Sequence, residues 1–421
     1  MADAPSSEAS ARRLTTTCCI AGGGPAGMML GLLLARAGIK ALVLEKHTDF
    51  LRDFRGDTLH PSTLEIMKEI GLDEALLKLP HQKVETLNVS IGDFDTIIGD
   101  FRRLPVAHPY IMLIPQWDFL DFLADHGEEL PAFDHLMDAE ATGLIERDGK
   151  VVGLRADTPD GPLEVMADLV VDATGRKSTL RSDAGLKVEN LGAPIDVFWF
   201  RLSRREVDTE RTGGRIDAGG FFVQIFRGHY WQCAFVIPKG YAEKIRAEGI
   251  AAFRDRIAKL MPFERARADE LKTFDDVKLL SVSVDRLEKW FKPGFLAIGD
   301  AAHAMSPVGG VGINLAIQDA VAAANILSGP LLRGRLETRD LEAVQRRRMM
   351  PTRIIQAGQV AAQDNILTPV LMARETIKPP LLVRLVARFP ILARIPARII
   401  GLGIRPEHVR APSARPPHVK A

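Results

Sequence analysis

A glycine-rich turn between a buried strand and an apolar helix constrains this chain more than any other feature. Residues 18–21 (Cys-Cys-Ile-Ala) form a short apolar run that is typical of a buried parallel strand. The turn, residues 22–27 (Gly-Gly-Gly-Pro-Ala-Gly), fits the pattern G-x-G-x-x-G, and an apolar helix follows it as far as Gly38, a C-terminal cap. A second strand, residues 41–44, ends at Glu45. This order of elements predicts a dinucleotide-binding site.

Each part of this unit has a physical role in binding phosphates. Gly22 permits the tight turn, Gly24 lets a pyrophosphate approach the backbone, and Gly27 lets the helix pack closely on the sheet. The helix start offers unpaired N–H groups and a positive dipole end, and Glu45 can accept hydrogen bonds from ribose hydroxyls. The alternative, a glycine-rich turn without a ligand, is disfavoured by the spacing. The candidate contacts are Gly22, Gly24, Pro25, Ala26, Gly27, Glu45 and Lys46.

Composition limits the class of protein. The chain has 421 residues and a net charge of +1, which gives no sign of a nucleic-acid partner. At about 150 residues a domain, this length predicts two or three units. The three cysteines lack disulfide or metal spacing, which fits a reducing cytoplasm. No apolar run reaches the ~18 residues of a membrane span, and the polar start lacks the apolar core of a secretory signal.

Alternating strands and helices predict an α/β protein. We expect a Rossmann-like nucleotide-binding domain interleaved with a strand-rich substrate domain, followed by C-terminal helices. The expected divisions are a disordered tail at 1–14, the nucleotide-binding domain at 15–83, 115–185 and 286–350, the substrate domain at 84–114 and 186–285, a helical segment at 351–404 and a tail at 405–421.

A second candidate site begins where the strand 295–299 ends in Asp300. An acid at the carboxyl end of a strand is well placed to bind a ligand hydroxyl, although it can instead cap the following helix. The loop 307–312 (Pro-Val-Gly-Gly-Val-Gly) brings bare backbone toward a flat ligand, and the helix that starts near Asn314 points its positive end there. The candidate contacts are Asp300, Pro307, Gly309, Gly310, Val311, Gly312 and Asn314.

With these motifs the chain resembles the FAD-dependent monooxygenases of the p-hydroxybenzoate hydroxylase type, the class A flavoprotein aromatic hydroxylases. The resemblance covers most of residues 17–327. The glycine turn with Glu45 matches the ADP-binding fingerprint of that family, and Gly299-Asp300 with its loop matches the family's GD motif. Residues 170–181 match the middle DG motif, except that Thr174-Gly175 stands in place of Asp-Gly. This departure bears on how the pyrophosphate edge and NAD(P)H are handled.

The resemblance implies cofactors and residue roles. FAD would be bound, and NAD(P)H and O₂ would drive hydroxylation of a small aromatic or related cyclic substrate through a flavin C4a-hydroperoxide. Asp300 would bind the ribityl chain, and the loop 307–312 would contact the isoalloxazine. Arg55 would lie beside the flavin and position it, and Gln116 would bind the ribityl or phosphate region. No metal site is expected, because the cofactor supplies the reactive oxygen.

Two other functions stay open. One is a related flavoenzyme, a halogenase or a prenyl reductase, since Asp-Ala-Thr-Gly at 172–175 also suits halogenases. Halogenases carry W-x-W-x-I-P, and the nearest stretch here, Cys-Ala-Phe-Val-Ile-Pro at 233–238, lacks both tryptophans. The other is a non-catalytic flavin-binding protein, which would show no oxygen-dependent NAD(P)H consumption.

Weaker signals have structural alternatives. His229, Tyr230 and Trp231 either line a substrate pocket or, as is commoner for aromatic residues in a strand, belong to the core. His303 is expected to make a structural hydrogen bond rather than to transfer a proton. The basic, apolar segment 380–404 is expected to pack on the protein or on a second subunit of a homodimer, rather than on a membrane; a monomer is the other expected state. Its arginines are Arg384, Arg388, Arg394 and Arg398.

Overall fold

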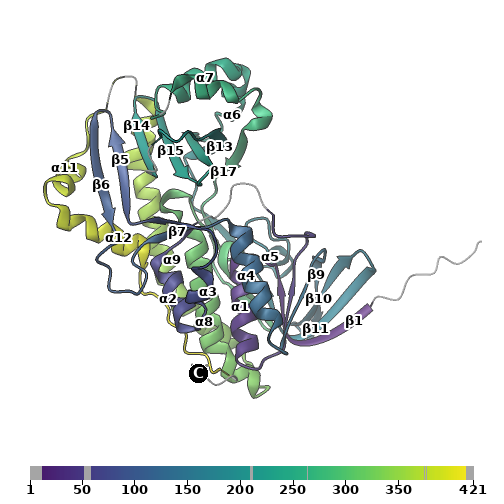
Figure 1. Ribbon diagram of the computed structural model, residues 1–421. Helices are drawn as coiled ribbons and strands as arrows, with labels where there is room; N and C mark the ends of the chain where they lie inside the picture. Colours follow the sequence, from purple (N-terminus) through teal and green to yellow (C-terminus); the bar gives the residue numbers. More distant parts are fainter. Residues whose placement is uncertain are drawn as a thin grey trace, which may run out of the picture.

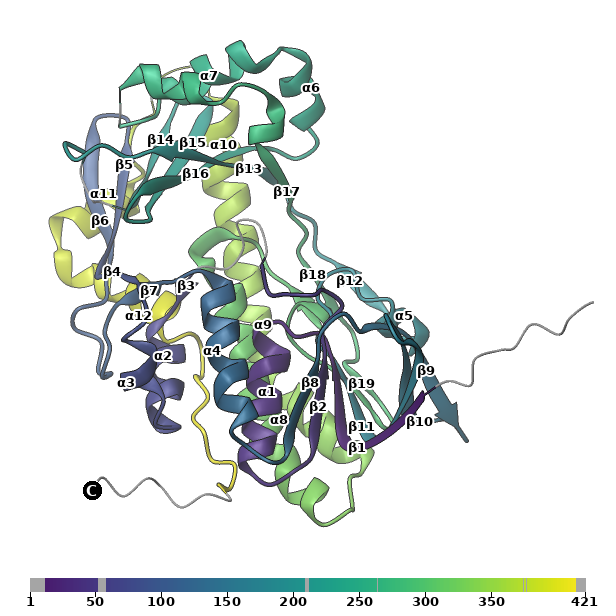
Figure 2. The same ribbon diagram turned by 45° about the vertical axis from the view of Figure 1, so that its right-hand side comes forward.

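Two β-sheets of different construction organise the molecule. The computed structural model describes residues 12–51, 58–208, 212–262, 264–373, 375 and 377–413. An eight-stranded sheet forms one body and a seven-stranded sheet the other. The long helix α9 (Thr338–Ala362) runs from the first body to the underside of the second (Figures 1 and 2). This arrangement is the α/β fold with an interleaved strand-rich part that the sequence predicts.

The eight-stranded sheet has a parallel centre. Five strands run in the order β20-β11-β1-β2-β8, and each neighbouring pair is parallel. The central strands are apolar and fully buried, as Cys18 to Ala21 illustrate, because a parallel sheet of this type is covered on both faces. The strands are β1 (Arg12–Ala21), β2 (Ala41–Leu44), β8 (Phe133–Leu136), β9 (Glu140–Arg147), β10 (Lys150–Thr158), β11 (Gly161–Asp172), β19 (Phe291–Lys292) and β20 (Phe295–Ala297).

Three helices cover one face of this sheet. They are α1 (Pro25–Arg36), α4 (Gln116–Glu128) and α8 (Gly312–Leu332), which lie side by side in Figure 2. The first of them ends at Arg36 and is followed by Gly38, whose φ of +83° is the left-handed cap conformation that the sequence indicates. The segment Val308–Leu332 is long and apolar enough to cross a membrane, which the sequence analysis did not anticipate. However, 72% of its most apolar 18-residue stretch is buried inside the protein. It is therefore the core helix of this body.

The seven-stranded sheet is antiparallel except where β14 meets β5. Its outer face packs on α6 (Ala242–Ala247) and α7 (Ile250–Ala258) through a cluster of phenylalanines. Its inner face packs on the π-helical turn (Gln363–Leu367) and α10 (Thr368–Met372), which follow the long helix α9. The strands are β5 (Thr86–Ile91), β6 (Phe94–Asp100), β13 (Ile195–Ser203), β14 (Gly213–Asp217), β15 (Gly220–Phe226), β16 (Tyr230–Pro238) and β17 (Lys278–Ser281). Residues 86–100 thus join the later strands, as interleaving requires.

Smaller elements connect the two bodies. The expected strand at 110–114 is present, but it pairs with β3 and β4 rather than with the seven-stranded sheet. These small strands are β3 (Thr58–Leu59), β4 (Gln82–Val84), β7 (Ile111–Leu113), β12 (Val188–Asn190), β18 (Asp285–Leu287) and β21 (His303–Ala304). The remaining helices are α2 (Pro61–Glu69), α3 (Asp73–Leu76), α5 (Leu180–Asp183), α11 (Leu381–Arg388) and α12 (Arg394–Gly401).

Candidate functional site

The carboxyl ends of the central parallel strands bring the two glycine-rich motifs to one edge of the sheet. Ala21 at the end of β1 is in register with Leu44 of β2 and with Asp172 of β11, and Asp172 is in register with Ala297 of β20. The turns that follow these four strands therefore open at the same edge. In open parallel sheets this edge is where ligands bind.

The first glycine turn has the shape that the sequence predicts. Gly22 has a φ of +105°, and a Cβ there would lie 2.4 Å from the carbonyl oxygen of Ala173. A Cβ on Gly27 would lie 1.9 Å from the carbonyl oxygen of Gly22, so only glycine lets α1 approach the sheet this closely. A Cβ on Gly24 would meet no protein atom within 4 Å. No atom of the described residues therefore requires glycine at 24, and close approach of a ligand there stays a prediction.

Glu45 is fixed beside this turn. One carboxylate oxygen accepts a hydrogen bond from the Gly23 N–H at 2.9 Å, and the other lies 2.5 Å from His47 Nδ1. The side chain is only 12% exposed. Lys46, the next predicted contact, instead directs its ammonium toward Glu140 at 3.6 Å and is half-exposed. Glu45 is thus the better placed of the two to meet a ribose.

Asp172 orders the turn in which Thr174-Gly175 replaces Asp-Gly. Its carboxylate accepts hydrogen bonds from the backbone N–H and the hydroxyl of Thr174, at 3.0 and 2.7 Å, and from the Ser178 hydroxyl at 2.5 Å. These hydrogen bonds lower the pKa of Asp172, but burial outweighs them and raises that pKa above its usual value. Asp172, two positions before Thr174, therefore supplies a carboxylate to this turn. Gly175 has a positive φ of +88°.

The middle motif reaches the second site through Arg176, a residue that the sequence analysis did not single out. Its Nε donates to the carboxylate of Asp300 at 2.9 Å, and its Nη2 donates to the carbonyl oxygen of Met305 at 3.1 Å. Its Nη1 is buried and has no partner among the described residues. The signal that could have found it is its place directly after Gly175, in the turn that follows a central strand. Arg176 therefore joins two motifs that are separated by more than a hundred residues.

The loop 307–312 is shaped by two glycines with positive φ. Gly309 has a φ of +82° and Gly310 a φ of +62°. Asn314, in the first turn of α8, holds the loop: its amide nitrogen donates to the carbonyl oxygens of Thr58 and Gly310, and its oxygen accepts from the His60 N–H. The Asn314 side chain is thus committed to protein contacts. Only the first-turn backbone N–H groups of α8 remain to meet an anion.

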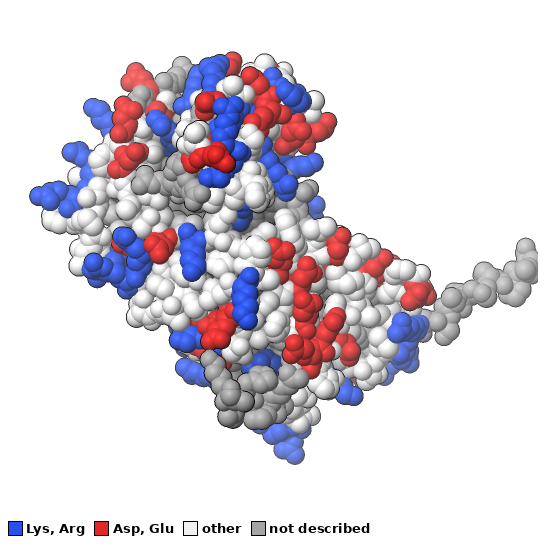
Figure 3. All heavy atoms as spheres, viewed as in Figure 1, with Lys and Arg blue, Asp and Glu red and all other residues white. Residues whose placement is uncertain are grey.

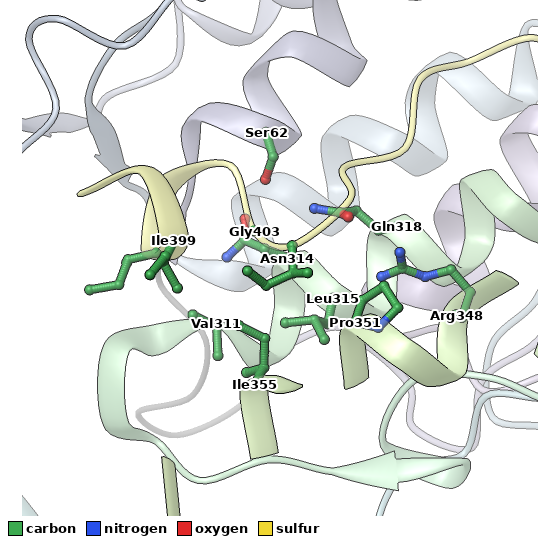
Figure 4. A pocket seen from close by; sticks show the side chains of 12 residues that line it. Ser62, Val311, Asn314, Leu315, Gln318, Arg348, Pro351, Ile355, Ile399 and Gly403 are labelled. Atoms are coloured by element: carbon green, nitrogen blue, oxygen red, sulfur yellow. The ribbon is translucent and has the colours of Figure 1, made fainter. Parts of the chain in front are cut away.

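A small cavity lies behind this loop, between α8, α9 and α12 (Figure 4). Its volume is about 10 Å³, which is room for at most about one water molecule. Asn314, Gln318 and Arg348 line it together with apolar side chains. The cavity is too small for any part of a nucleotide, so it belongs to the packing behind the loop.

A buried charge network fixes the turn at Asp300 from the other side. Asp319 accepts hydrogen bonds from the Gly299 N–H at 3.1 Å, His303 Nε2 at 2.6 Å and Arg348 Nε at 2.8 Å. Burial alone would raise the pKa of Asp319, but the charges of His303 and Arg348 and their hydrogen bonds outweigh it and lower that pKa. Arg348 also contacts Glu407 at 3.3 Å. His303 therefore makes the structural hydrogen bond that the sequence analysis favoured.

The remaining predicted residues differ in position and burial. Gln116 is the first residue of α4 and is half-buried. Arg55 lies outside the described residues. Trp231 is fully buried in the outer core of the seven-stranded sheet, where its indole nitrogen donates to Asp208, so it lines no pocket. His229 is exposed.

We expect Glu45→Ala and Asp300→Ala each to weaken FAD binding by roughly tenfold, since each removes a hydrogen-bonding carboxylate from this edge of the sheet. Titration of the apoprotein with FAD measures the affinity. Asp160→Ala, in the exposed turn between β10 and β11, is the control and should bind FAD as the unchanged protein does. Unchanged affinity in both site variants would contradict the predicted cofactor site.

Known proteins are similar to this chain over most of its length. The family described as "FAD binding domain" matches residues 15–357. The chain is 34% identical over 333 residues to 6-methylpretetramide 4-monooxygenase of Streptomyces rimosus, with 78% of this chain and 79% of that protein covered. It is 31% identical to rifampicin monooxygenase of Streptomyces venezuelae, over 70% of this chain but only 60% of that protein. The structure of p-nitrophenol 4-monooxygenase PnpA from Pseudomonas putida DLL-E4 has the same fold, with a TM-score of 0.76 at 19% identity, over 92% of this chain and 97% of that one.

Proposed function

This chain belongs to the FAD binding domain family, and from that premise we propose that it uses NAD(P)H and O₂ to hydroxylate a small aromatic or related cyclic compound. The chain is an FAD-dependent monooxygenase, as the resemblance predicted. Bound FAD supplies the redox chemistry that activates O₂. The residues of the chain bind FAD, orient it and shield it from water.

We assign the parts of FAD to the residues already described. The pyrophosphate would lie against Gly24 and the start of α1, and a ribose against Glu45. Asp300 would meet the ribityl chain. Arg176, which is paired with Asp300 and carries a buried nitrogen without a partner among the described residues, would hold that carboxylate in place. The loop 307–312 with the start of α8 would face the isoalloxazine.

One observation carries the choice of an aromatic substrate. The inner face of the seven-stranded sheet is apolar, and Val308 from the glycine loop packs against it. The centre of this face is buried against the π-helical turn and α10, so its partly buried members Trp199, Phe221 and Val223 are the apolar side chains that a flat ring system would meet. Trp199 lies on this face, half-buried, and its indole N–H has no partner among the described residues. It is a candidate to stack on the substrate and to donate to a ring oxygen.

The positions of Cys233 and Phe235 also argue against the halogenase alternative. Cys233 and Phe235 occupy the places of the two signature tryptophans, and both are buried on the outer face of the sheet. That face packs on α6 and α7, so neither residue faces the loop 307–312. The halogenase and the non-catalytic flavin protein are the alternatives that the following experiment tests.

We expect an aromatic substrate to stimulate NAD(P)H oxidation without added halide, with one oxygen atom from O₂ in the product. The measurement is mass spectrometry of the product formed under isotopically labelled O₂, with and without chloride or bromide. Phenols form the substrate panel, and each assay without substrate is its control. A halogenated product, or turnover that depends on halide, would favour the halogenase. Absence of oxygen-dependent NAD(P)H consumption with every compound would favour the non-catalytic protein.

Several finer assignments belong to this proposal. We propose a cytoplasmic enzyme, a role for Arg55 beside the flavin, and the domain boundaries given from the sequence. Either nicotinamide cofactor fits the proposal, and stopped-flow reduction with NADH and NADPH distinguishes them. A monomer or a homodimer is equally compatible with it.

A further inference from the structure

The two short C-terminal helices present an amphipathic face that the function above does not use. The helices α11 and α12 lie against β6 at the edge of the seven-stranded sheet, at the left of Figure 1. One side of α12 is well packed: Ala397 is fully buried, and a Cβ on Gly401 would lie 3.0 Å from Leu104 and 3.1 Å from Phe101. Val386 is the one buried residue of α11. The helices are therefore anchored on the protein by one face, as the sequence analysis expected.

The opposite face is apolar and exposed. Its large side chains are between 41% and 79% exposed, which is unusual for so many neighbouring leucines and isoleucines on a folded protein. Leu381 and Leu385 are spaced i and i+4, as are Ile395 and Ile399, so each pair lies on one side of its helix. We call this set the apolar ridge; its members are Leu381, Leu382, Leu385, Phe389, Ile391, Ile395 and Ile399.

The charged side chains of the segment that carries the apolar ridge have one sign. Residues 378–405 contain six Lys and Arg side chains and no Asp or Glu. Two arginine pairs at i and i+4 adjoin the ridge, Arg384 with Arg388 and Arg394 with Arg398. In Figure 3 blue side chains mark the left edge of the molecule, where these helices lie in Figure 1. The segment thus combines exposed apolar side chains with six positive charges and no acidic side chain of its own.

We propose that this face docks on the surface of an anionic phospholipid bilayer. The apolar ridge would enter the boundary between headgroups and acyl chains, while the arginines reach the headgroups with their charged ends. Charge decides between this partner and a second copy of the chain. A symmetric dimer through the ridge would bring two sets of like charges together, which is unfavourable, whereas each basic residue near an anionic bilayer strengthens binding about fivefold. This docking is independent of the catalytic proposal.

The test is flotation of the full FAD-loaded protein with vesicles. Vesicles of phosphatidylcholine alone are compared with vesicles that also contain phosphatidylglycerol. We expect binding to the anionic vesicles only, weakening as salt rises. Leu381→Asp with Leu385→Asp should lower binding by more than tenfold, and Arg384→Gln with Arg388→Gln should lower it by about 25-fold and reduce its salt dependence.

A matched control separates the ridge from exposed apolar residues in general. Val207 is 87% exposed but lies outside this face, so Val207→Asp should leave vesicle binding unchanged. Retained flavin absorbance verifies that each variant is folded, and Ile391→Asp replaces the leucine pair if that variant does not fold. Failure of the unchanged protein to float with anionic vesicles would overturn the proposal. A dimer in sedimentation velocity that Leu381→Asp with Leu385→Asp dissociates would instead assign the face to a second copy.

Discussion

Replacing Arg348 by alanine should lower the free energy of unfolding by about 3–5 kcal/mol. The guanidinium is fully buried and lies between Asp319 and Glu407, with Nε 2.8 Å from the Asp319 carboxylate and Nη1 3.3 Å from Glu407. The alanine variant would leave the fully buried Asp319 carboxylate without this charge partner. A buried charge that loses its partner costs far more than the pair contributes when it is intact.

The measurement is urea-induced unfolding of the apoprotein. Arg346→Ala is the matched control, since Arg346 lies on the same helix and pairs at i and i+4 with Glu342 on the surface, where its side chain is 68% exposed. An exposed pair of this kind contributes about 0.3–0.5 kcal/mol. Equal losses in the two variants would contradict the assignment of Arg348 to a stabilising buried network.

The same network has a consequence for the cofactor site. Asp319 accepts the Gly299 N–H as well as the guanidinium, and Gly299 directly precedes Asp300. Loss of Arg348 therefore loosens the turn that presents Asp300. We therefore expect the buried charge cluster to contribute to the geometry of the proposed FAD site without touching FAD.

Local patterns predicted the elements that hold the site. Gly22 and Gly38 have positive φ, and both were expected from the turn and cap chemistry of glycine. The buried run at 18–21 became a central parallel strand because a continuous apolar run fits a sheet that is covered on both faces. These features depend on neighbouring residues only, which a sequence displays directly.

Contacts between distant segments were not predictable in the same way. Nothing in the sequence pairs Arg176 with Asp300, which lies 124 positions away, or Arg348 with Asp319. The pairing of β7 with β3 and β4, rather than with the strands beside it in sequence, is of the same kind. Register and long-range ion pairs follow from how the whole chain packs, so one sequence without its fold leaves them undetermined.

The apolar segment at 308–332 shows a further limit. Its composition allows a membrane span or a core helix, and only its burial distinguishes the two. The exposed apolar ridge of α11 and α12 shows the converse. Its periodicity was visible in the sequence, but the face that remained uncovered became clear only once the other face was seen to pack on the sheet.

Gly24→Ala should weaken FAD binding by about ten- to a hundredfold while leaving the apoprotein as stable as before. Gly24 has a φ of –74°, which alanine adopts readily, and a Cβ there would meet no protein atom within 4 Å. Alanine is a poorer N-cap than glycine, but it also reduces the freedom of the unfolded chain, so the two stability effects offset each other. The Cβ would occupy the space through which the pyrophosphate approaches the backbone N–H groups. Hydrogen bonds to a charged group contribute about 1.5–3 kcal/mol each, which sets the size of the expected loss.

Gly27→Ala is the contrasting variant, because its Cβ would lie 1.9 Å from the Gly22 carbonyl oxygen. We expect it to destabilise the apoprotein by about 1–3 kcal/mol, since α1 must move away from the sheet to make room. Thermal melting of both apoproteins and titration with FAD measure the two effects separately. A Gly24→Ala protein that melts early, or that binds FAD with unchanged affinity, would contradict the assignment of position 24 to the pyrophosphate. Because one glycine is needed by the ligand and the other by the fold, the two substitutions should dissociate binding from stability within a single turn.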